Sequence, residues 1–113
     1  MVMILKRGAV VGVRDDLDFL SKARPALVVQ ASDYIEARDT ILVCLFTTTL
    51  AEGVFFRPII EPSEDNGLTA RSALQADKLM AVRKSRLSEE VWGYLSSTDM
   101  KKINRAIRLI LEI

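Results

Sequence analysis

The amino-acid sequence predicts a small, mainly β protein in which an antiparallel barrel is followed by one C-terminal α-helix. Seven short segments rich in β-branched and aromatic residues follow one another at close spacing, which is typical of small barrels. Only the last segment places its apolar residues three and four positions apart, as an amphipathic helix does. The chain has 113 residues, of which 50% are hydrophobic and 27% charged, so we expect one globular domain over residues 1–113.

The first two strands are expected at residues 8–13 and 25–30. Proline fixes its own φ, lacks an N–H group and keeps the preceding residue extended, so Pro25 begins a strand and Arg24 lies at the mouth of that strand. The run after Pro25 is apolar without polar alternation, which predicts a strand buried on both faces. A rigid sheet would therefore hold the guanidinium of Arg24 in a fixed position and direction.

The lack of histidine restricts the catalytic and metal-binding chemistry that the side chains can support. The chain has no histidine and one cysteine, which excludes Ser-His-Asp catalysis, Cys-His catalysis and nearly every zinc site. Cys44 lies inside an apolar run, and we expect a buried, unreactive thiol. Asp15, Asp16 and Asp18 lack the glycine and the later glutamate of a calcium loop, so a solvated turn is expected there. We predict no metal and no cofactor.

The third strand is expected at residues 40–46, where an uninterrupted apolar and β-branched run favours a central strand. A polar connection at residues 32–38, with room for one helical turn, separates it from the second strand. The third strand ends in three polar residues, Thr47, Thr48 and Thr49. Threonines at a strand end are usually exposed and make local hydrogen bonds.

The remaining strands are predicted to be short. Pro58 indicates that the fourth strand lies at a sheet edge or contains a bulge. An Asn-Gly pair predicts a turn at the end of the loop at 61–67. These later strands are expected at residues 54–60, 72–76, 78–82 and 91–95.

A C-terminal helix is expected at residues 97–112, with Ser97 or Thr98 as its cap. Lysines, arginines and Asn104 occupy one face of this segment. The helix would close the barrel or form a contact between subunits. Its apolar face is predicted to consist of Met100, Ile103, Ala106, Ile107, Ile110 and Leu111.

Charge is distributed unevenly along the chain, although the net charge is only +1. Residues 71–108 hold nine Lys or Arg against four Asp or Glu, which suits either solvated faces or a surface that attracts a polyanion. The apolar N-terminal residues 1–5 are too few for a signal peptide, and no apolar run reaches the roughly 20 residues of a membrane span. We therefore expect a soluble, cytoplasmic protein without a membrane partner.

Several short motifs occur in an order that is informative as a whole, although no single one is diagnostic. They are Arg7-Gly8-x-Val10-Val11, Lys22-Ala23-Arg24-Pro25-Ala26-Leu27-Val28-Val29-Gln30, an apolar strand running into Thr47, Gly67-Leu68, Ser72-Ala73-Leu74, Asp77, Lys84-Ser85-Arg86-Leu87 and Leu95-Ser96-x-x-Asp99-Met100. In this order, and over nearly the whole chain, they resemble the MazF/PemK family of toxin endoribonucleases. The resemblance implies an SH3-like barrel that acts as a homodimer, cleaves single-stranded RNA without metal and is neutralised by an antitoxin whose tail lies on the toxin dimer.

The resemblance also implies roles for individual residues. Arg24 matches the family's catalytic arginine before proline, and Thr47 matches its catalytic threonine at the end of the third strand. In such chemistry a ribose 2′-hydroxyl attacks its own phosphate, and a guanidinium and a hydroxyl stabilise the negative charge that develops. Arg24 would stabilise the phosphorane, with proton transfer as a second role open to it, and Thr47 would donate a hydrogen bond to a phosphate oxygen. Further RNA-binding residues implied by the resemblance are Lys22, Thr48, Thr49 and Lys78.

The sequence departs from the family pattern at three of the compared positions. Phe19 stands where the loop before the arginine usually has a glutamate, and Gly12 stands where an aromatic residue is common. Lys78 replaces the glutamine that usually follows the acidic residue near the sixth strand. These differences leave the RNA sequence preference unpredicted.

Two other functions stay open at the level of sequence. Gyrase-binding toxins of the CcdB type resemble the family in fold, but they typically end in Trp-Gly-Ile, whereas this chain ends in Leu-Ile-Leu-Glu-Ile and has its only tryptophan at position 92. Phe19 also suits an inactive barrel that serves as a binding module.

Overall fold

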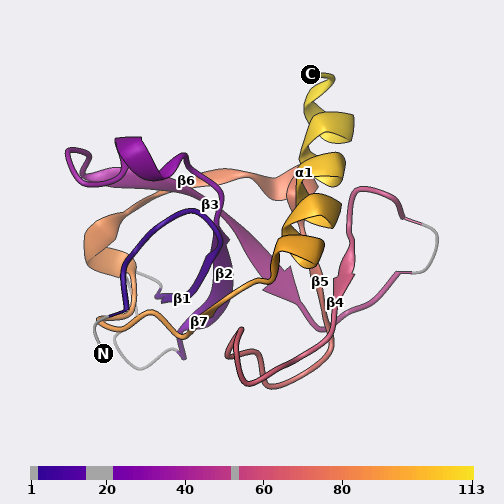
Figure 1. The fold of residues 1–113 in the computed structure, drawn as a ribbon, viewed down its shortest axis with the longest axis horizontal. Helices are drawn as coiled ribbons and strands as arrows, with labels where there is room; N and C mark the ends of the chain where they lie inside the picture. Colours follow the sequence, from indigo (N-terminus) through magenta and orange to yellow (C-terminus); the bar gives the residue numbers. More distant parts are fainter. Residues whose placement is uncertain (1–2, 15–21, 52–53) are drawn as a thin grey trace.

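The structure is a computed structural model that describes residues 3–14, 22–51 and 54–113, and it is mainly β (Figure 1). Its strands are β1 (Ala9–Val13), β2 (Arg24–Val28), β3 (Thr40–Thr47), β4 (Ile59–Ile60), β5 (Ser72–Leu74), β6 (Met80–Arg83) and β7 (Gly93–Tyr94). They form a curled antiparallel sheet in the order β4-β5-β3-β2-β1-β7, and β6 also pairs with β3. The helix α1 (Ser97–Leu111) follows, so the predicted class and strand direction are confirmed.

Strand β1, the interior of β2 and the second half of β3 are buried on both faces, as their continuous apolar runs predict, whereas Leu42 in the first half of β3 is 39% exposed. Successive side chains of a strand point to opposite faces, so a sheet with two buried faces needs apolar residues at every position. Val11 and Val28 belong to one hydrophobic cluster, whereas their neighbours Val10 and Leu27 belong to a second cluster on the other face. Strand β3 is central because β2, β5 and β6 all pair with it.

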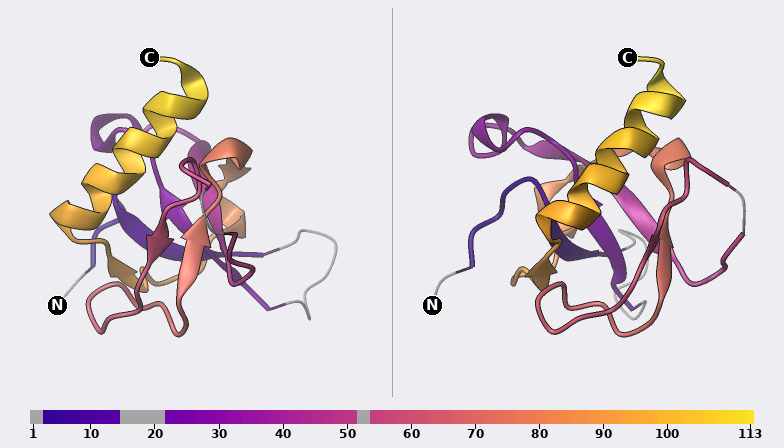
Figure 2. Two further views of the ribbon diagram at one scale, coloured as in Figure 1. Left: turned by 90° about the vertical axis from the view of Figure 1, so that its right-hand side faces the viewer. Right: turned by 45° about the vertical axis from the view of Figure 1, so that its right-hand side comes forward.

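Helix α1 packs along one side of the sheet and covers the second cluster (Figure 2). Ile103 is fully buried there, and Ala106 is also buried. The N-cap is Ser96 rather than the predicted Ser97 or Thr98, because the Ser96 hydroxyl accepts a hydrogen bond of 3.1 Å from the N–H of Asp99. No helix within residues 3–14, 22–51 and 54–113 is both long and apolar enough to cross a membrane.

The C-terminal end of α1 extends beyond the sheet (Figure 2). Ile110 and Leu111 belong to the predicted apolar face, and 39% and 47% of their surface is exposed. Leu109 and Ile113 are exposed as well. The last turn therefore does not close the barrel, and for these residues the alternative of a contact between subunits stays a prediction.

The predicted fourth strand at 54–60 is wrong for its first half. Residues 55–57 form a turn in which the N–H of Arg57 donates to the carbonyl of Val54 at 3.1 Å, and Phe55 is 83% exposed. Strand β4 starts after Pro58, which has no N–H for the ladder but whose carbonyl accepts from Leu74. Because β4 ends the sheet order, the edge position expected from proline is confirmed.

Three short 3₁₀-helices account for other differences from the predicted strands. η1 (Ser32–Tyr34) is the helical turn allowed for the connection after β2. η2 (Ala76–Lys78) occupies residues that were divided between two predicted strands, and it separates β5 from β6. η3 (Lys84–Arg86) follows β6.

Gly12 and Trp92 pack closely where β1 faces the start of β2. A side-chain Cβ on Gly12 would lie 2.4 Å from Cζ2 of Trp92, so only glycine leaves room for the ring. Gly12 is also the register partner of Pro25. The absence of an aromatic residue at position 12 therefore has a local reason in this fold.

Cys44 is buried in the cluster beneath α1, as expected from the sequence. Burial raises the pKa of its thiol to about 11, with a smaller contribution from the negative charge of Asp77. The thiol stays protonated near neutral pH and does not act as a nucleophile there.

Candidate active site

Arg24 and Thr47 are brought to the same end of neighbouring antiparallel strands. Arg24 is the first residue of β2 and Thr47 is the last residue of β3. The register pairs Ala26 with Leu45, and the same register carried two residues further sets Arg24 opposite Thr47. Arg24 is exposed, whereas the interior of β2 is buried. The rigid centre of the sheet thus places the two predicted catalytic residues side by side.

Both residues line one open cleft of about 690 Å³, a size that accommodates a small ligand or part of a chain. Its charged lining residues, within the part of the chain that the structure describes, are Arg24 and Lys78. The cleft is therefore suited to an anion. Its full lining consists of Arg24, Pro25, Leu45, Phe46, Thr47, Thr48, Ser72, Gln75, Lys78, Leu79 and Met80.

The three threonines at the end of β3, Thr47 to Thr49, do not share one environment. Thr47 and Thr48 line the cleft, but Thr49 is not among its lining residues. The N–H of Thr49 donates to the Thr47 hydroxyl oxygen at 3.2 Å. That bond uses a lone pair of the hydroxyl and not its hydrogen, so Thr47 can still donate to an anion.

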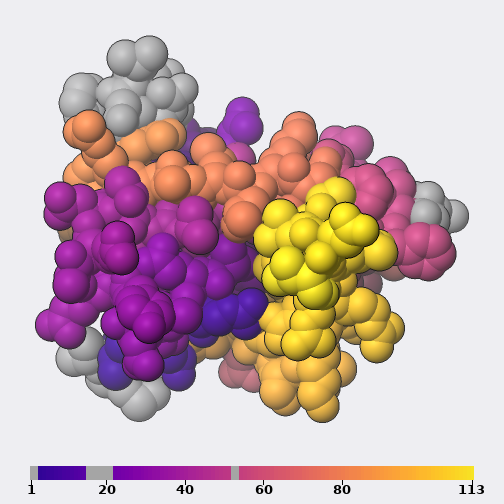
Figure 3. Space-filling model, turned by 90° about the horizontal axis from the view of Figure 1, so that it is seen from above, coloured from indigo at the N-terminus to yellow at the C-terminus, as the bar shows by residue number. Residues whose placement is uncertain are grey.

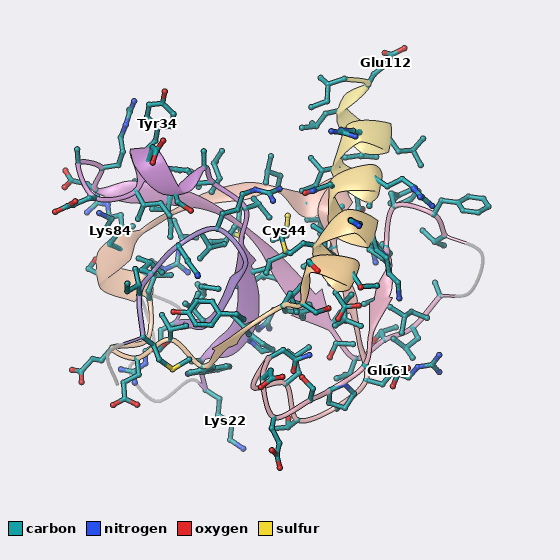
Figure 4. All side chains as sticks on the ribbon, viewed as in Figure 1. Lys22, Tyr34, Cys44, Glu61, Lys84 and Glu112 are labelled. Carbon is teal, nitrogen blue, oxygen red and sulfur yellow. The ribbon has the colours of Figure 1, made fainter. Side chains whose placement is uncertain are left out.

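The two predicted RNA-binding lysines also differ. Lys78 lies in η2 and lines the cleft, although it was predicted to be in a strand. Lys22 precedes β2 and extends away from the sheet, outside the cleft lining (Figure 4). The predicted turn at Asp15, Asp16 and Asp18 and the position of Phe19 lie outside the described residues.

Gln75 is one of two polar cleft residues, with Ser72, that the sequence reasoning did not assign to the site. It was assigned to a strand, but it stands between β5 and η2 and lines the cleft. Its N–H donates to the carbonyl of Leu45 at 3.0 Å, which ties this connection to β3. Its side-chain amide has both donors and acceptors, as contacts with a nucleobase require. The available signal was a single polar residue inside the apolar run 73–76.

An ion pair lies next to the cleft, between Arg57 and Asp77. Hydrogen bonds from Arg57 hold the pKa of the Asp77 carboxyl below its usual value, and burial opposes this effect only in part. The same bonds raise the pKa of Arg57. Asp77 thus stays ionised and remains hydrogen-bonded to Arg57.

A second cavity of about 1100 Å³ lies on another part of the surface and is larger than the cleft. Its lining includes Glu61, Glu64, Asp65 and Asp99, with Lys6 as its basic residue. Carboxylates repel phosphate groups, so this cavity is less suited to a nucleic acid than the smaller cleft. In the described ranges, no group of three or more Cys, Asp or Glu side chains is arranged to hold a metal ion.

Comparison with known proteins identifies the family to which this chain belongs. Residues 6–111 match the model of the PemK-like, MazF-like toxins of type II toxin–antitoxin systems. The chain belongs to this family. It is also 36% identical over 95 residues to a Mycolicibacterium smegmatis protein named as a probable endoribonuclease MazF, covering 84% of this chain and 85% of that protein.

Solved structures support the same fold assignment for this PemK/MazF-like chain. An endoribonuclease from a mycobacterial species, solved in complex with its cognate antitoxin, superposes with a TM-score of 0.79 at 23% identity and covers 97% of both chains. A MazE–MazF complex from Deinococcus radiodurans gives a TM-score of 0.77 at 18% identity, with 98% of each chain covered. The toxin MazF-mt6 of Mycobacterium tuberculosis gives 0.76 at 19% identity, covering 93% of this chain and 97% of that one.

Proposed function

We propose that this chain, as a single domain over residues 1–113, is a cytoplasmic toxin that cleaves single-stranded RNA. The observation that carries the proposal is the strand register that sets Arg24 opposite Thr47 in a cleft whose described charged residues are basic. Membership of the PemK/MazF-like toxin family supports the same reaction.

In the proposed reaction the nucleophile is the ribose 2′-hydroxyl next to the cut. This hydroxyl loses its proton, its oxygen bonds to phosphorus, and the bond between phosphorus and the 5′ oxygen breaks as that oxygen takes up a proton. The products are a 2′,3′-cyclic phosphate and a 5′-hydroxyl. Arg24 stabilises the charge on the phosphorane oxygens, and Thr47 donates a hydrogen bond to one of them. No metal is required, because the substrate supplies its own nucleophile.

The other polar residues of the cleft hold the RNA in this proposal. Lys78 and Thr48 contact the backbone near the cut, and Gln75 faces a base. Lys22 and Thr49 lie outside the cleft lining, so we assign them to the approaching RNA strand on either side of it.

Purified protein incubated with a single-stranded RNA in EDTA tests the reaction directly. We expect cleavage at full rate, with a 2′,3′-cyclic phosphate and a 5′-hydroxyl at the new ends. An oligonucleotide with deoxyribose at the cut site should not be cleaved, because it lacks the nucleophile. Cleavage of the deoxy oligonucleotide would contradict the mechanism, and RNA binding without cleavage would instead identify an inactive binding module.

We also propose that the toxin forms a homodimer through the apolar end of α1. A groove of about 650 Å³ lies between this end of the helix and the turn before β4, and the two segments are neighbours when seen from above (Figure 3). Phe55, Leu109 and Ile113 line the groove and are 83%, 59% and 81% exposed. Exposed apolar surface of this kind is typical of subunit contacts.

Light scattering tests the dimer and its position. Micromolar protein should have twice the chain mass of 12.6 kDa, and Leu109→Asp should shift it to the monomer, because a carboxylate in an apolar contact loses its hydration. Arg38→Asp, which changes an exposed residue away from α1, should leave the dimer intact. A monomeric wild-type protein would contradict this proposal.

The proposed regulatory partner is an acidic antitoxin, which would bind Lys102, Arg105 and Arg108, the basic residues that line the same groove. A co-expressed acidic antitoxin should bind the toxin with an affinity that falls as salt increases, and it should suppress RNA cleavage. Binding that does not change with salt would argue against contacts to these three residues.

A further inference from the structure

The contact between Arg57 and Asp77 is more constrained than the other described arginine ion pair. Nε and Nη2 of Arg57 each donate to a different oxygen of Asp77, and both distances are 2.9 Å. The two side chains are 25% and 23% exposed. Glu61 and Arg71 instead share one contact of 2.7 Å, and their side chains are 68% and 57% exposed. Two parallel hydrogen bonds in a partly buried place fix orientation, whereas an exposed single contact constrains little.

The Arg57–Asp77 pair adds a side-chain link between two segments that the pairing of β4 with β5 already brings close. Arg57 belongs to the turn before β4, where it precedes Pro58. Asp77 is the middle residue of η2, and two residues close to it line the cleft: Lys78, which follows it in η2, and Gln75, which directly precedes η2. The ion pair therefore anchors the turn next to both cleft residues, although neither Arg57 nor Asp77 lines the cleft itself.

The ion pair adds to the packing of η2, since Ala76 is buried and η2 contacts both α1 and β3. η2 is one 3₁₀ turn of three residues without a side-chain cap. Its main-chain bonds include Lys78 N–H to the Gln75 carbonyl at 3.0 Å and Gln75 N–H to the Leu45 carbonyl at 3.0 Å. A turn of this length is readily displaced unless side chains tie it to neighbouring segments.

We propose that the Arg57–Asp77 pair is a positioning device for RNA, and this inference rests on the proposed function. The pair holds η2 in place so that Gln75 and Lys78 face the substrate. It has a second effect, because Arg57 neutralises a carboxylate that would otherwise repel RNA phosphates beside the cleft. The proposal assigns Asp77 no role as the base for the 2′-hydroxyl, since Asp77 is not among the residues that line the cleft.

Kinetics of single-stranded RNA cleavage separate this positioning role from catalysis. Arg57→Ala should raise KM by roughly tenfold and change kcat by less than about threefold, because Arg24 and Thr47 keep their places on the sheet. The double variant Arg57→Ala/Asp77→Ala should bind RNA better than Arg57→Ala, since the unpaired carboxylate is gone. Arg57→Lys keeps the charge but not the two-point contact, so only part of the affinity should return. If Arg57→Lys restored the full RNA affinity, Arg57 would act only by neutralising the charge of Asp77. That result would overturn the positioning inference.

Amide hydrogen exchange without RNA tests the same device independently of activity. The N–H groups of Gln75 and Lys78 should exchange faster in Arg57→Ala and in Asp77→Asn than in the wild-type protein. Glu61→Ala is the matched control, because it breaks the exposed ion pair with Arg71 and should change neither exchange nor KM. Unchanged exchange in both variants, or faster exchange with an unchanged KM, would overturn the inference. If the wild-type protein does not cleave RNA, the proposed function fails, while exchange still decides whether the pair holds η2.

Discussion

Arg24→Ala is expected to reduce kcat/KM for RNA cleavage by about 10²–10³-fold, which is the scale for loss of a preorganised contact to a transition state. The guanidinium presents parallel donors to the phosphorane oxygens, and no other described arginine lines the cleft. Arg24→Lys should recover only part of the rate, because an ammonium group cannot reproduce the planar contact. Single-turnover cleavage of one RNA oligonucleotide measures both variants.

The controls for this prediction use stability and charge. Arg24 is exposed at the start of β2, so its removal should leave the melting temperature nearly unchanged. Arg38→Ala removes the same charge from an exposed residue outside the cleft and should retain nearly full activity. Thr47→Val preserves the shape of its side chain and removes the hydroxyl, so it should also slow cleavage while stability is kept. Full activity of Arg24→Ala would remove the residue on which the proposed mechanism depends.

Ile103→Ala is expected to lower the free energy of unfolding by about 2–5 kcal/mol, the range for deleting a large buried aliphatic side chain. Ile103 is 0% exposed and packs in the cluster that contains Val10, Leu27 and Cys44. The deletion would leave a cavity between α1 and the sheet. Urea denaturation at one fixed protein concentration gives the change as a lower midpoint.

The matched control lies two turns further along the same helix. Ile110→Ala deletes the same atoms from a side chain that is 39% exposed, and in the monomeric Leu109→Asp background it should cost less than about 1 kcal/mol. Equal losses for the two variants would mean that α1 is not held to the sheet mainly by its buried face.

The main strands were predictable because a buried strand leaves a strong local signal. The apolar runs of β2 and β3 admit no polar residue, and Pro25 determines where an extended segment begins. The placement of Arg24 beside Thr47 follows from the same facts, once the two strands pair antiparallel. This part of the site was therefore within reach of the sequence, and the resemblance to a known family pointed to the same two residues.

The errors arose where long-range contacts decide local structure. Phe55 and Phe56 suit a strand by composition, but this segment turns, and its Arg57 bonds to a residue 20 positions away. Residues 76 and 78 were assigned to two different predicted strands, yet residues 76–78 form η2, with Asp77 held by that arginine. A local sequence pattern does not indicate a hydrogen-bond partner that lies 20 positions away. The same limitation hid Gln75, whose role depends on the shape of the connection and not on its own strand propensity.

The close packing of Gly12 and Trp92 makes Trp92 an intrinsic fluorescent probe of this part of the sheet. Trp92 is the chain's single tryptophan, so all indole emission comes from one place. Its ring lies against Gly12, and the register partners Gly12 with Pro25 and the adjacent Val13 with Arg24. Fluorescence from the unlabelled protein therefore monitors the strand junction that supports the guanidinium, and it does so without an added dye that would alter the cleft.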